Sequence, residues 1–146
     1  MKKVLLATAI ATMTIVFGTS LNAQNKLTVK VSNLENSKGT LMVALFDSKT
    51  PFLGKATHGE MTKITGTEAE VTFENLPGGE YGVALFQDAN NSNTLDLGQY
   101  GIPTEKYGFS NNIDPAATKG TPTFEQCKFE LKGNSTIEIK AIAASK

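Results

Sequence analysis

The sequence predicts an all-β domain, a single antiparallel β-sandwich of seven strands, and three observations lead to this prediction. Short runs of β-branched and apolar residues with a two-residue alternation recur between turn residues. No segment after residue 23 combines a sustained helical apolar period with a capped start, so at most a turn or two of helix is expected. Residues 24–146 suffice for one hydrophobic core. The seven predicted strands span residues 27–31, 40–46, 61–65, 70–74, 80–86, 124–131 and 136–142.

Alternation within these strands also predicts which side chains point inward, because successive residues of a strand face opposite sides. In residues 70–74, Val71 and Phe73 are expected in the core, while the residues between them face water. The same reasoning places four further side chains inside: Phe129, Leu131, Ile137 and Ile139. Residues 41–46 and 83–86 are instead apolar on both faces. We therefore expect these two strands at the centre, covered on their second side by a loop or a partner.

These two central strands share a short similarity, Val-Ala-Leu-Phe, followed by Asp47 in one strand and by Gln87 and Asp88 in the other. Two core strands of similar composition explain the similarity without any further relation. If the two strands run in the same direction, the loops that follow them share one end of the sandwich. Asp47 would then lie close to Asp88.

The first 23 residues have the pattern of a secretory signal peptide. Lys2 and Lys3 precede an uncharged apolar run over residues 4–18, which is shorter than the roughly 20 residues that cross a membrane. We expect cleavage after Ala23, with cleavage after Ser20 as the alternative. Because no cysteine lies near this junction, we do not expect a lipid anchor. The domain of residues 24–146 is then exported to the periplasm or the extracellular space, without membrane insertion once the signal is removed.

Charge and cysteine content exclude several classes of partner. All 14 basic residues are lysines; without the two in the signal, 12 remain against 14 acidic residues, so the domain has a net charge near −2. Arginine, the residue best suited to bidentate phosphate recognition, is absent, so nucleic acid is not expected as a partner. The single cysteine, Cys127, cannot form an internal disulfide, and we interpret it as a small buried hydrophobe rather than a reactive thiol, since His58 is remote in sequence.

A turn between two predicted strands carries a first resemblance. Residues 70–86 read EVTFENLPGGEYGVALF. Leu76 is expected to close the end of the core, Pro77 to preset a turn dihedral, Gly78 and Gly79 to supply positive φ, and Tyr81 to start the return strand. The pattern resembles the turn of prealbumin-like and collagen-adhesin B-type modules, in which the tyrosine packs at a sandwich corner.

A second resemblance covers nearly the whole domain. The chain contains, in order, LTVKVSNLENSKGTLMVALFDS, TFENLPGGEYGVALFQDANNSNTLD, GIPTEKYGFSNN and PTFEQCKFELKGNSTIEI. This order is similar to a bacterial exported family known as domain of unknown function 2141. The resemblance implies an exported, immunoglobulin-like or prealbumin-like sandwich with one long loop, about residues 88–122, and it implies no biochemical activity. The family's loop reads Asp-x-Asn-x-Asn-Gly-x-Leu-Asp, where this chain has Ser92 and Asn93 in place of the second Asn and the Gly.

The segment after the second central strand has the start of a calcium-loop pattern. Its oxygen ligands would occupy positions one, three, five, seven (a backbone carbonyl) and nine: Asp88, Asn90, Ser92, Thr94 and Asp96. The glycine of position six is Asn93, which tolerates a left-handed conformation, and the glutamate of position twelve is Gln99. Glu105 or Asp47 would have to close the site. We expect either a weak structural calcium site or an Asx-rich turn whose side chains bond their own backbone.

The remainder of the long loop is rich in aromatic residues. One interpretation is that four of its side chains cover the second face of the central strands: Tyr100, Ile102, Tyr107 and Phe109. The other is a shallow pocket for a sugar, a peptide or a small apolar ligand, formed by Tyr100, Tyr107, Phe109, Asn111 and Asn112. A loop held by a rigid scaffold favours a functional role.

The sequence lacks the motifs of common enzyme classes. It contains no G-x-S-x-G elbow, no H-E-x-x-H motif and no cluster of histidines or cysteines, and we interpret His58 as a surface residue. A carboxylate pair, Asp88 with Asp96 or Glu105, would allow a hydrolase as the less favoured alternative. We predict a non-catalytic binding or structural module whose ligand is a small molecule, a glycan or a protein, or alternatively a calcium-stabilised interaction or assembly domain. The oligomeric state stays open.

Overall fold

The computed structural model describes residues 24–143, so the predicted signal peptide lies outside the described residues. The elements follow in this order: β1 (Asn25–Ser32), β2 (Thr40–Asp47), β3 (His58–Lys63), β4 (Ala69–Leu76), β5 (Gly79–Asp88), η1 (Gln99–Gly101), β6 (Tyr107–Phe109), η2 (Ser110–Asn112), α1 (Pro115–Thr118), α2 (Phe124–Cys127), β7 (Phe129–Leu131) and β8 (Ser135–Lys140). Both α-helices have a single turn, as predicted. Within these residues no helix is long and apolar enough to cross a membrane.

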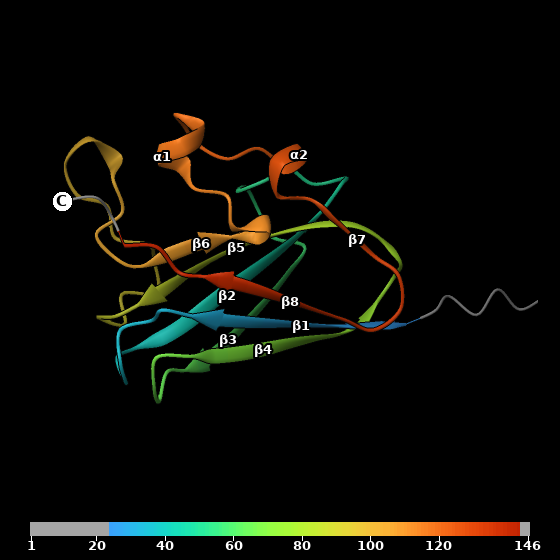
Figure 1. Ribbon diagram of the computed structural model, residues 1–146, viewed down its shortest axis with the longest axis horizontal. Helices are drawn as coiled ribbons and strands as arrows, with labels where there is room; N and C mark the ends of the chain where they lie inside the picture. The colour runs from blue at the N-terminus through green and yellow to red at the C-terminus, as the bar shows by residue number, and fades with distance from the viewer. Residues whose placement is uncertain (1–23, 144–146) are drawn as a thin grey trace, which may run out of the picture.

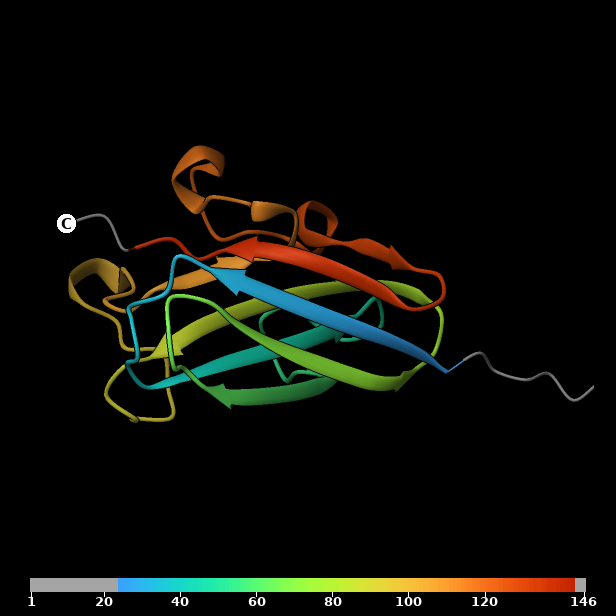
Figure 2. The same ribbon diagram turned by 60° about the horizontal axis from the view of Figure 1, so that its bottom comes forward.

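The strands form two sheets packed face to face (Figures 1 and 2). One sheet has the order β4-β1-β8, and the other has the order β3-β2-β5-β6 with β7 paired to the start of β5. This arrangement confirms the all-β, two-sheet prediction. The prediction of seven antiparallel strands is wrong, because residues 24–143 form eight strands and β8 runs parallel to β1. Parallel neighbours need a long connection, and the segment between β1 and β8, which includes the whole second sheet, provides it.

The core lies between the two sheets and consists of the inward-facing residues that alternation predicted. Val71, Phe73, Leu131 and Ile139 are buried, as expected. They pack with the inner residues of β1, β2 and β5: Leu27, Val29, Val31, Leu41, Val43, Leu45, Val83 and Leu85. Phe129 and Ile137 are partly buried at the edge of this cluster. The two sheets therefore share one hydrophobic core.

Two predicted strands differ from the observed ones. The predicted strand over residues 61–65 is shifted, because β2 pairs with His58–Lys63, while Ile64 leaves the strand and is buried. Pairing to a central strand here outweighs the weak strand propensity of the Gly59 region. The predicted strand over residues 124–131 is correct only at its end. Residues 124–127 form α2, whose start is stabilised by the Thr123 N–H donating to the Gln126 side-chain oxygen at 2.9 Å.

The turn between β4 and β5 closes one corner of the sandwich. The Tyr81 hydroxyl donates a 2.8 Å hydrogen bond to the Pro77 carbonyl, and the ring is buried, which confirms its position at the corner. Gly79 has the expected positive φ, but the prediction is wrong for Gly78. The other positive φ of this turn is at Asn75, with a value of 58°.

The two central strands, β2 and β5, run antiparallel, so their short sequence similarity does not bring their ends together. Asp47 is paired with Tyr81, whereas Asp88 is paired with Thr40 at the other end of the sheet. Seven residues of strand separate the two carboxylates by about 24 Å. Asp47 therefore cannot close a site at Asp88, and its Oδ1 instead accepts hydrogen bonds from the amides of Lys49 and Thr50.

Candidate functional site

The loop that follows β5 brings the predicted oxygen ligands together but uses them internally. Asp88 is 1% exposed, and its two carboxylate oxygens accept 2.9 Å hydrogen bonds from the amides of Ser92 and Asn93. Asn93 has φ of 62°, which confirms its predicted left-handed conformation. Ser92 Oγ donates to the Thr94 carbonyl and to Asp96 Oδ1, at 2.9 and 3.2 Å. The Asx-rich turn is therefore formed as one of the two expected alternatives.

Glu105 holds the two ends of this loop together. Its Oε1 accepts a 2.9 Å hydrogen bond from the Ala89 amide, and its Oε2 accepts a 3.2 Å bond from the Asp96 amide. The Glu105 side chain is 8% exposed, so these bonds form largely away from water. One side chain thus satisfies two backbone donors, and removing it would leave these amides without their acceptor. Glu105 thus lies beside the loop, as the calcium hypothesis required, but it contacts backbone amides.

Among the described residues, no group of three or more His, Cys, Asp or Glu side chains is placed to hold a metal ion. The calcium hypothesis also relies on neutral oxygens from Asn90, Ser92 and Thr94, so it stays a prediction. Asn90 Nδ2 donates to Asp96 Oδ2, which ties the third and ninth positions of the loop to each other. An ion would have to replace or reorient these internal hydrogen bonds.

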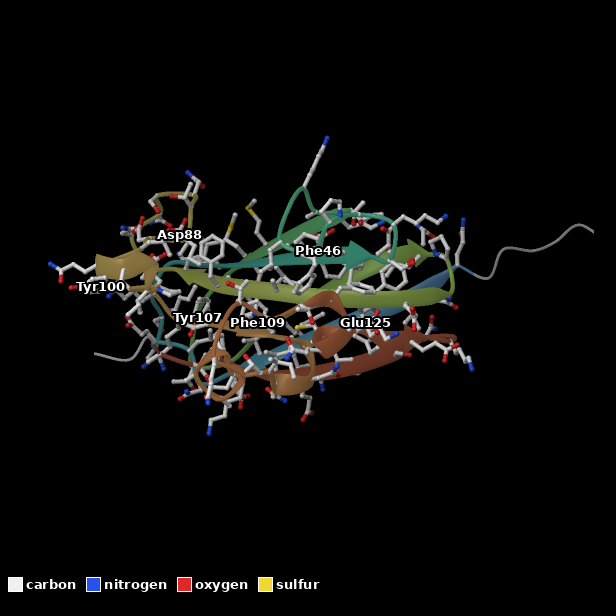
Figure 3. The ribbon with its side chains drawn as sticks, turned by 90° about the horizontal axis from the view of Figure 1, so that it is seen from above. Phe46, Asp88, Tyr100, Tyr107, Phe109 and Glu125 are labelled. Carbon is white, nitrogen blue, oxygen red and sulfur yellow. The ribbon has the colours of Figure 1, made fainter. Side chains whose placement is uncertain are left out.

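The aromatic residues of the long loop separate into two groups. Tyr100 is 96% exposed, and Ile102 is 43% exposed, so they do not cover the sheet as one interpretation expected. They lie at the tip of a hairpin in which Leu97 bridges Pro103 and the Gly98 amide donates to the Ile102 carbonyl at 2.8 Å. This tight turn points Tyr100 away from the sheet (Figure 3). Tyr107 and Phe109, in contrast, belong to β6 and lie on the sheet.

The side chains of Asn111 and Asn112 form hydrogen bonds with the backbone of neighbouring segments. Asn111 Nδ2 donates to the carbonyls of Gln126 and Lys128, each at 2.9 Å. Asn112 Oδ1 accepts a 2.8 Å bond from the Lys140 amide. Both asparagines thus fix the connection from β6 to the neighbouring segments. Of the five predicted pocket residues, the structure brings together only Tyr107 and Phe109.

The outer face of the β3-β2-β5-β6 sheet holds a wide apolar groove. Its cavity volume is about 550 Å³. Its floor and walls come from the outward residues of the central strands, from the edge strands β3 and β6 and from two flanking loops: Met42, Ala44, Phe46, Leu53, Gly59, Met61, Ala84, Phe86, Leu95, Tyr107 and Phe109. Of the described residues that line it, Glu60 is the only charged one. We call this cavity the groove.

Aromatic contacts shape one side of the groove. The Phe52 ring, from the loop after β2, lies with its centre 5.1 Å from that of Phe46 and 6.5 Å from that of Phe109. The Tyr107 and Phe109 rings are 6.0 Å apart and nearly perpendicular. Edge-to-face pairs of this kind fix the orientation of the rings. Figure 3 shows Phe46, Tyr107 and Phe109 on this face, while Asp88 and Tyr100 lie toward one end.

Other parts of the groove remain open to solvent. Met61 is 64% exposed and Leu53 is 40% exposed, and Met42, Ala44 and Phe86 are half-buried. Tyr107 is half-buried as well, and burial, together with the negative charge of Asp114, raises the pKa of its hydroxyl. The phenol is therefore neutral at pH 7 and can donate a hydrogen bond at the rim. The groove thus combines an uncharged floor with a single neutral polar group.

A family model described as an uncharacterized protein conserved in bacteria (DUF2141) matches residues 29–139, well over half of the 146-residue chain. The chain belongs to this family. The match extends from β1 to β8 and includes every strand that lines the groove. No curated protein and no solved structure matches the chain. The DUF2141 assignment therefore supplies a family without a chemistry.

Sequence reasoning missed the residues of this DUF2141 protein that position the loop and the groove. Gln87 is 1% exposed, and its amide bonds the backbone of Glu35 and Lys38, which fixes the loop between β1 and β2 against the end of β5. No local pattern identifies this role, since the partners lie about 50 positions away. The groove itself had a signal, the apolar character of both faces of β2 and β5, which predicted a cover but not a partly open one.

The remaining chemically reactive residues lie outside the groove. Cys127 is fully buried in α2, and burial raises the pKa of its thiol to about 11, which confirms its interpretation as a buried hydrophobe. His58 is exposed at the start of β3, as predicted. Neither residue is placed for nucleophilic attack on a molecule in the groove of this DUF2141 protein.

Proposed function

We propose that this protein is an exported, non-catalytic binding module whose groove takes up a small apolar ligand. The groove is the observation that carries the proposal. Its volume of about 550 Å³ lies within the range of about 300 to 1,000 Å³ for small-molecule sites. A water-exposed sheet face normally carries polar residues, as the outward positions of β4 do with Glu70 and Glu74.

The composition of the groove suits an apolar ligand better than a sugar. Sugar sites place several polar groups around an aromatic ring, whereas here the Tyr107 hydroxyl is the main polar contact besides Glu60. Met42 and Met61 lie side by side on paired strands, and flexible thioether side chains adapt to irregular apolar shapes. Residues 95–109 of the long loop also contribute to the proposed binding surface, but the exposed Tyr100 at the tip of this segment does not.

The proposal assigns no catalytic role to the carboxylates near the loop. Both oxygens of Asp88 and both oxygens of Glu105 accept backbone hydrogen bonds, so these carboxylates already hold the loop together. A hydrolytic carboxylate must reach its substrate, and neither carboxylate lines the groove. A binding module is therefore the better-supported proposal than a carboxylate-based hydrolase.

Export rests on the first 23 residues and also stays a proposal. The two lysines and the short apolar run fit a cleaved signal peptide. A separate proposal, that the sandwich is prealbumin-like, is supported by the position of Tyr81 at the corner. N-terminal sequencing of the protein recovered after export should give Gln24 as the first residue. Recovery of the intact chain from the cytoplasm alone would refute export.

Binding can be tested with the solvatochromic dye Nile red. We expect the purified protein to bind the dye with a blue shift and enhanced emission. Ala44→Leu and Ala84→Leu fill the groove floor and should weaken binding at least tenfold, whereas Ala117→Leu makes the same change on the exposed surface of α1 and should leave it unchanged. Equal binding by all three variants, or no binding by the unmodified protein, would show that the groove is not a ligand site.

A further inference from the structure

Resting on the proposed function, the geometry of the groove points to one class of ligand, which we infer to be an unbranched alkyl chain that lies across the strands. The bottom of the groove is formed by three small residues paired across neighbouring strands: Gly59 on β3, Ala44 on β2 and Ala84 on β5. The next partner in this register is Phe109 on β6. The deepest part of the groove therefore runs perpendicular to the strands, from the edge strand β3 toward β6.

Two ridges border this channel. On one side, Met61, Met42, Phe86 and Tyr107 are partners in the same strand register, two residues further along each strand. On the other side, Phe46 and Phe52 form an edge-to-face pair. Because residues on one strand face are about 6.8 Å apart, each ridge lies about one such step from the channel, which leaves a width of a single chain.

A glycine on the same face of the sheet, beside the second ridge, adds to this shape. Gly82 precedes Ala84 on β5 by two residues, and an added Cβ at Gly82 would lie 3.0 Å from Phe52. The missing side chain lets Phe52 settle against the sheet and form the second ridge. Phe52 thus closes the channel on that side, and it leaves the three small residues uncovered.

The two ends of the channel differ. At β6, Phe109 is 9% exposed and packs against Phe52 and Tyr107, so an aromatic wall closes this end. At β3, Gly59 is exposed and has no side chain, so the other end is open to water. From β3 to β6 the channel spans three strand spacings, about 14 Å. A linear chain fits such a blind channel with its terminal methyl group at Phe109 and its polar head at the β3 edge.

Charge agrees with this orientation. The channel floor is uncharged, whereas Glu60, next to Gly59 on β3, is exposed at the open end. This carboxylate is in water, where its field is screened, so the edge accepts a hydrated polar head without selecting strongly for its charge. A free fatty acid and a lysolipid contain the same chain and would both satisfy the site. A broad polycyclic molecule would instead have to displace a ridge.

Calorimetric titration with alkyl carboxylates below their micelle concentrations tests the inference, with pyrene as the polycyclic comparison. Affinity for the carboxylates should rise about fourfold per added methylene until the chain fills the channel and then level off. Dodecyl maltoside and dodecyltrimethylammonium should bind within tenfold of dodecanoate, because the chain provides the contact. Binding of pyrene should be at least tenfold weaker than that of dodecanoate.

A matched pair of glycine variants locates the chain. A Cβ at Gly59 would meet only the Val43 carbonyl, at 4.0 Å, and a Cβ at Gly66 would meet nothing within 4 Å, so neither backbone position excludes a side chain. Gly59→Val blocks the open end and should weaken dodecanoate binding at least tenfold, while Gly66→Val should not change it. If Nile red binds in the groove but pyrene binds as tightly as dodecanoate, or Gly59→Val has no effect, the alkyl-chain inference is wrong and the proposed function stands. If neither Nile red nor dodecanoate binds, both fail.

Discussion

Gly39 provides a quantitative test of how the structure holds the base of the loop after β5. Gly39 has φ of 71°, and an added Cβ would lie 1.9 Å from the Asp88 carbonyl oxygen and 2.8 Å from the Ala89 Cα. Both contacts are with backbone, so a side-chain rotation cannot relieve them. In Gly39→Ala the backbone must therefore move by about 1 Å or more, against the partly buried hydrogen bonds that Gln87 makes to Glu35 and Lys38.

The expected loss of stability has two parts. A left-handed alanine costs about 1–2 kcal/mol, of which the lower entropy of the unfolded chain offsets about 0.4–1 kcal/mol. The backbone clash adds to this, and we expect a total loss of about 3–5 kcal/mol, which belongs to the severe class of substitutions. Urea denaturation followed by circular dichroism measures the loss, provided that the slope of the transition is unchanged.

Two other glycines have the same backbone conformation without the clash, so comparison with them measures the contribution of the backbone clash at Gly39. Gly101 and Gly133 also have φ of 71°, and an added Cβ at either meets nothing within 4 Å. Their alanine variants should lose only about 1 kcal/mol each. Hydrogen exchange of the Ser92 and Asn93 amides, which bond the Asp88 carboxylate, should accelerate in Gly39→Ala beyond the global loss of stability. The reasoning is refuted if Gly39→Ala loses no more stability than Gly101→Ala.

Three further predictions concern the loop and the buried thiol. The melting temperature should be the same in 10 mM calcium and in chelator, because the loop oxygens are already hydrogen-bonded; a site with a dissociation constant of 0.1–1 mM would add about 1.4–2.7 kcal/mol and a clear upward shift. Glu105→Gln should cost about 1–3 kcal/mol in chemical denaturation, since one of the Ala89 and Asp96 amides loses its acceptor, and an equal loss in the exposed Glu125→Gln would contradict this. Cys127 should resist iodoacetamide at pH 8 in the folded protein and react in urea, because its thiol is buried and its pKa is about 11; rapid labelling of the folded protein would count against its burial. Since burial raises this pKa above the 9.0 of an exposed thiol, the stability linked to the protonated thiol is present below pH 9 and is lost between pH 9 and 11.

Local chemistry was sufficient to predict much of the loop after β5. The spacing of Asp88 and Asn93 predicted both an Asx turn and a left-handed residue, and both are formed within six positions of the chain. The role of Glu105 could not be predicted in the same way, because it depends on a hairpin that returns the chain to Ala89. Short-range hydrogen bonds are encoded by neighbouring residues, whereas a clamp between distant backbone amides depends on the tertiary fold.

For two predictions that were wrong, the sequence also contained a pattern that favoured the observed conformation. The alternation of polar and apolar side chains over residues 126–131 favoured a strand, but Thr123 and Gln126 have the spacing of a helix start, and residues 124–127 form the helix. Tyr100 is aromatic and was one candidate to cover the sheet, but Gly98 and Gly101 on either side of it allow the tight hairpin that points it outward. In both places the turn chemistry decided the conformation over the hydrophobic pattern.

The strongest argument for a binding role comes from comparing strands within the same molecule. The outward residues of β4 and β8 include Glu70, Glu74 and Glu138, so this chain does form wet sheet faces where a face meets water. In the groove, the outward positions of β2 and β5 are instead methionine, alanine and phenylalanine, although loops cover them only in part. Incomplete burial alone does not require this composition, because threonine at Ala44 and Ala84 would keep strand propensity and tolerate water. An apolar molecule that completes the cover explains why the face is apolar and open at the same time.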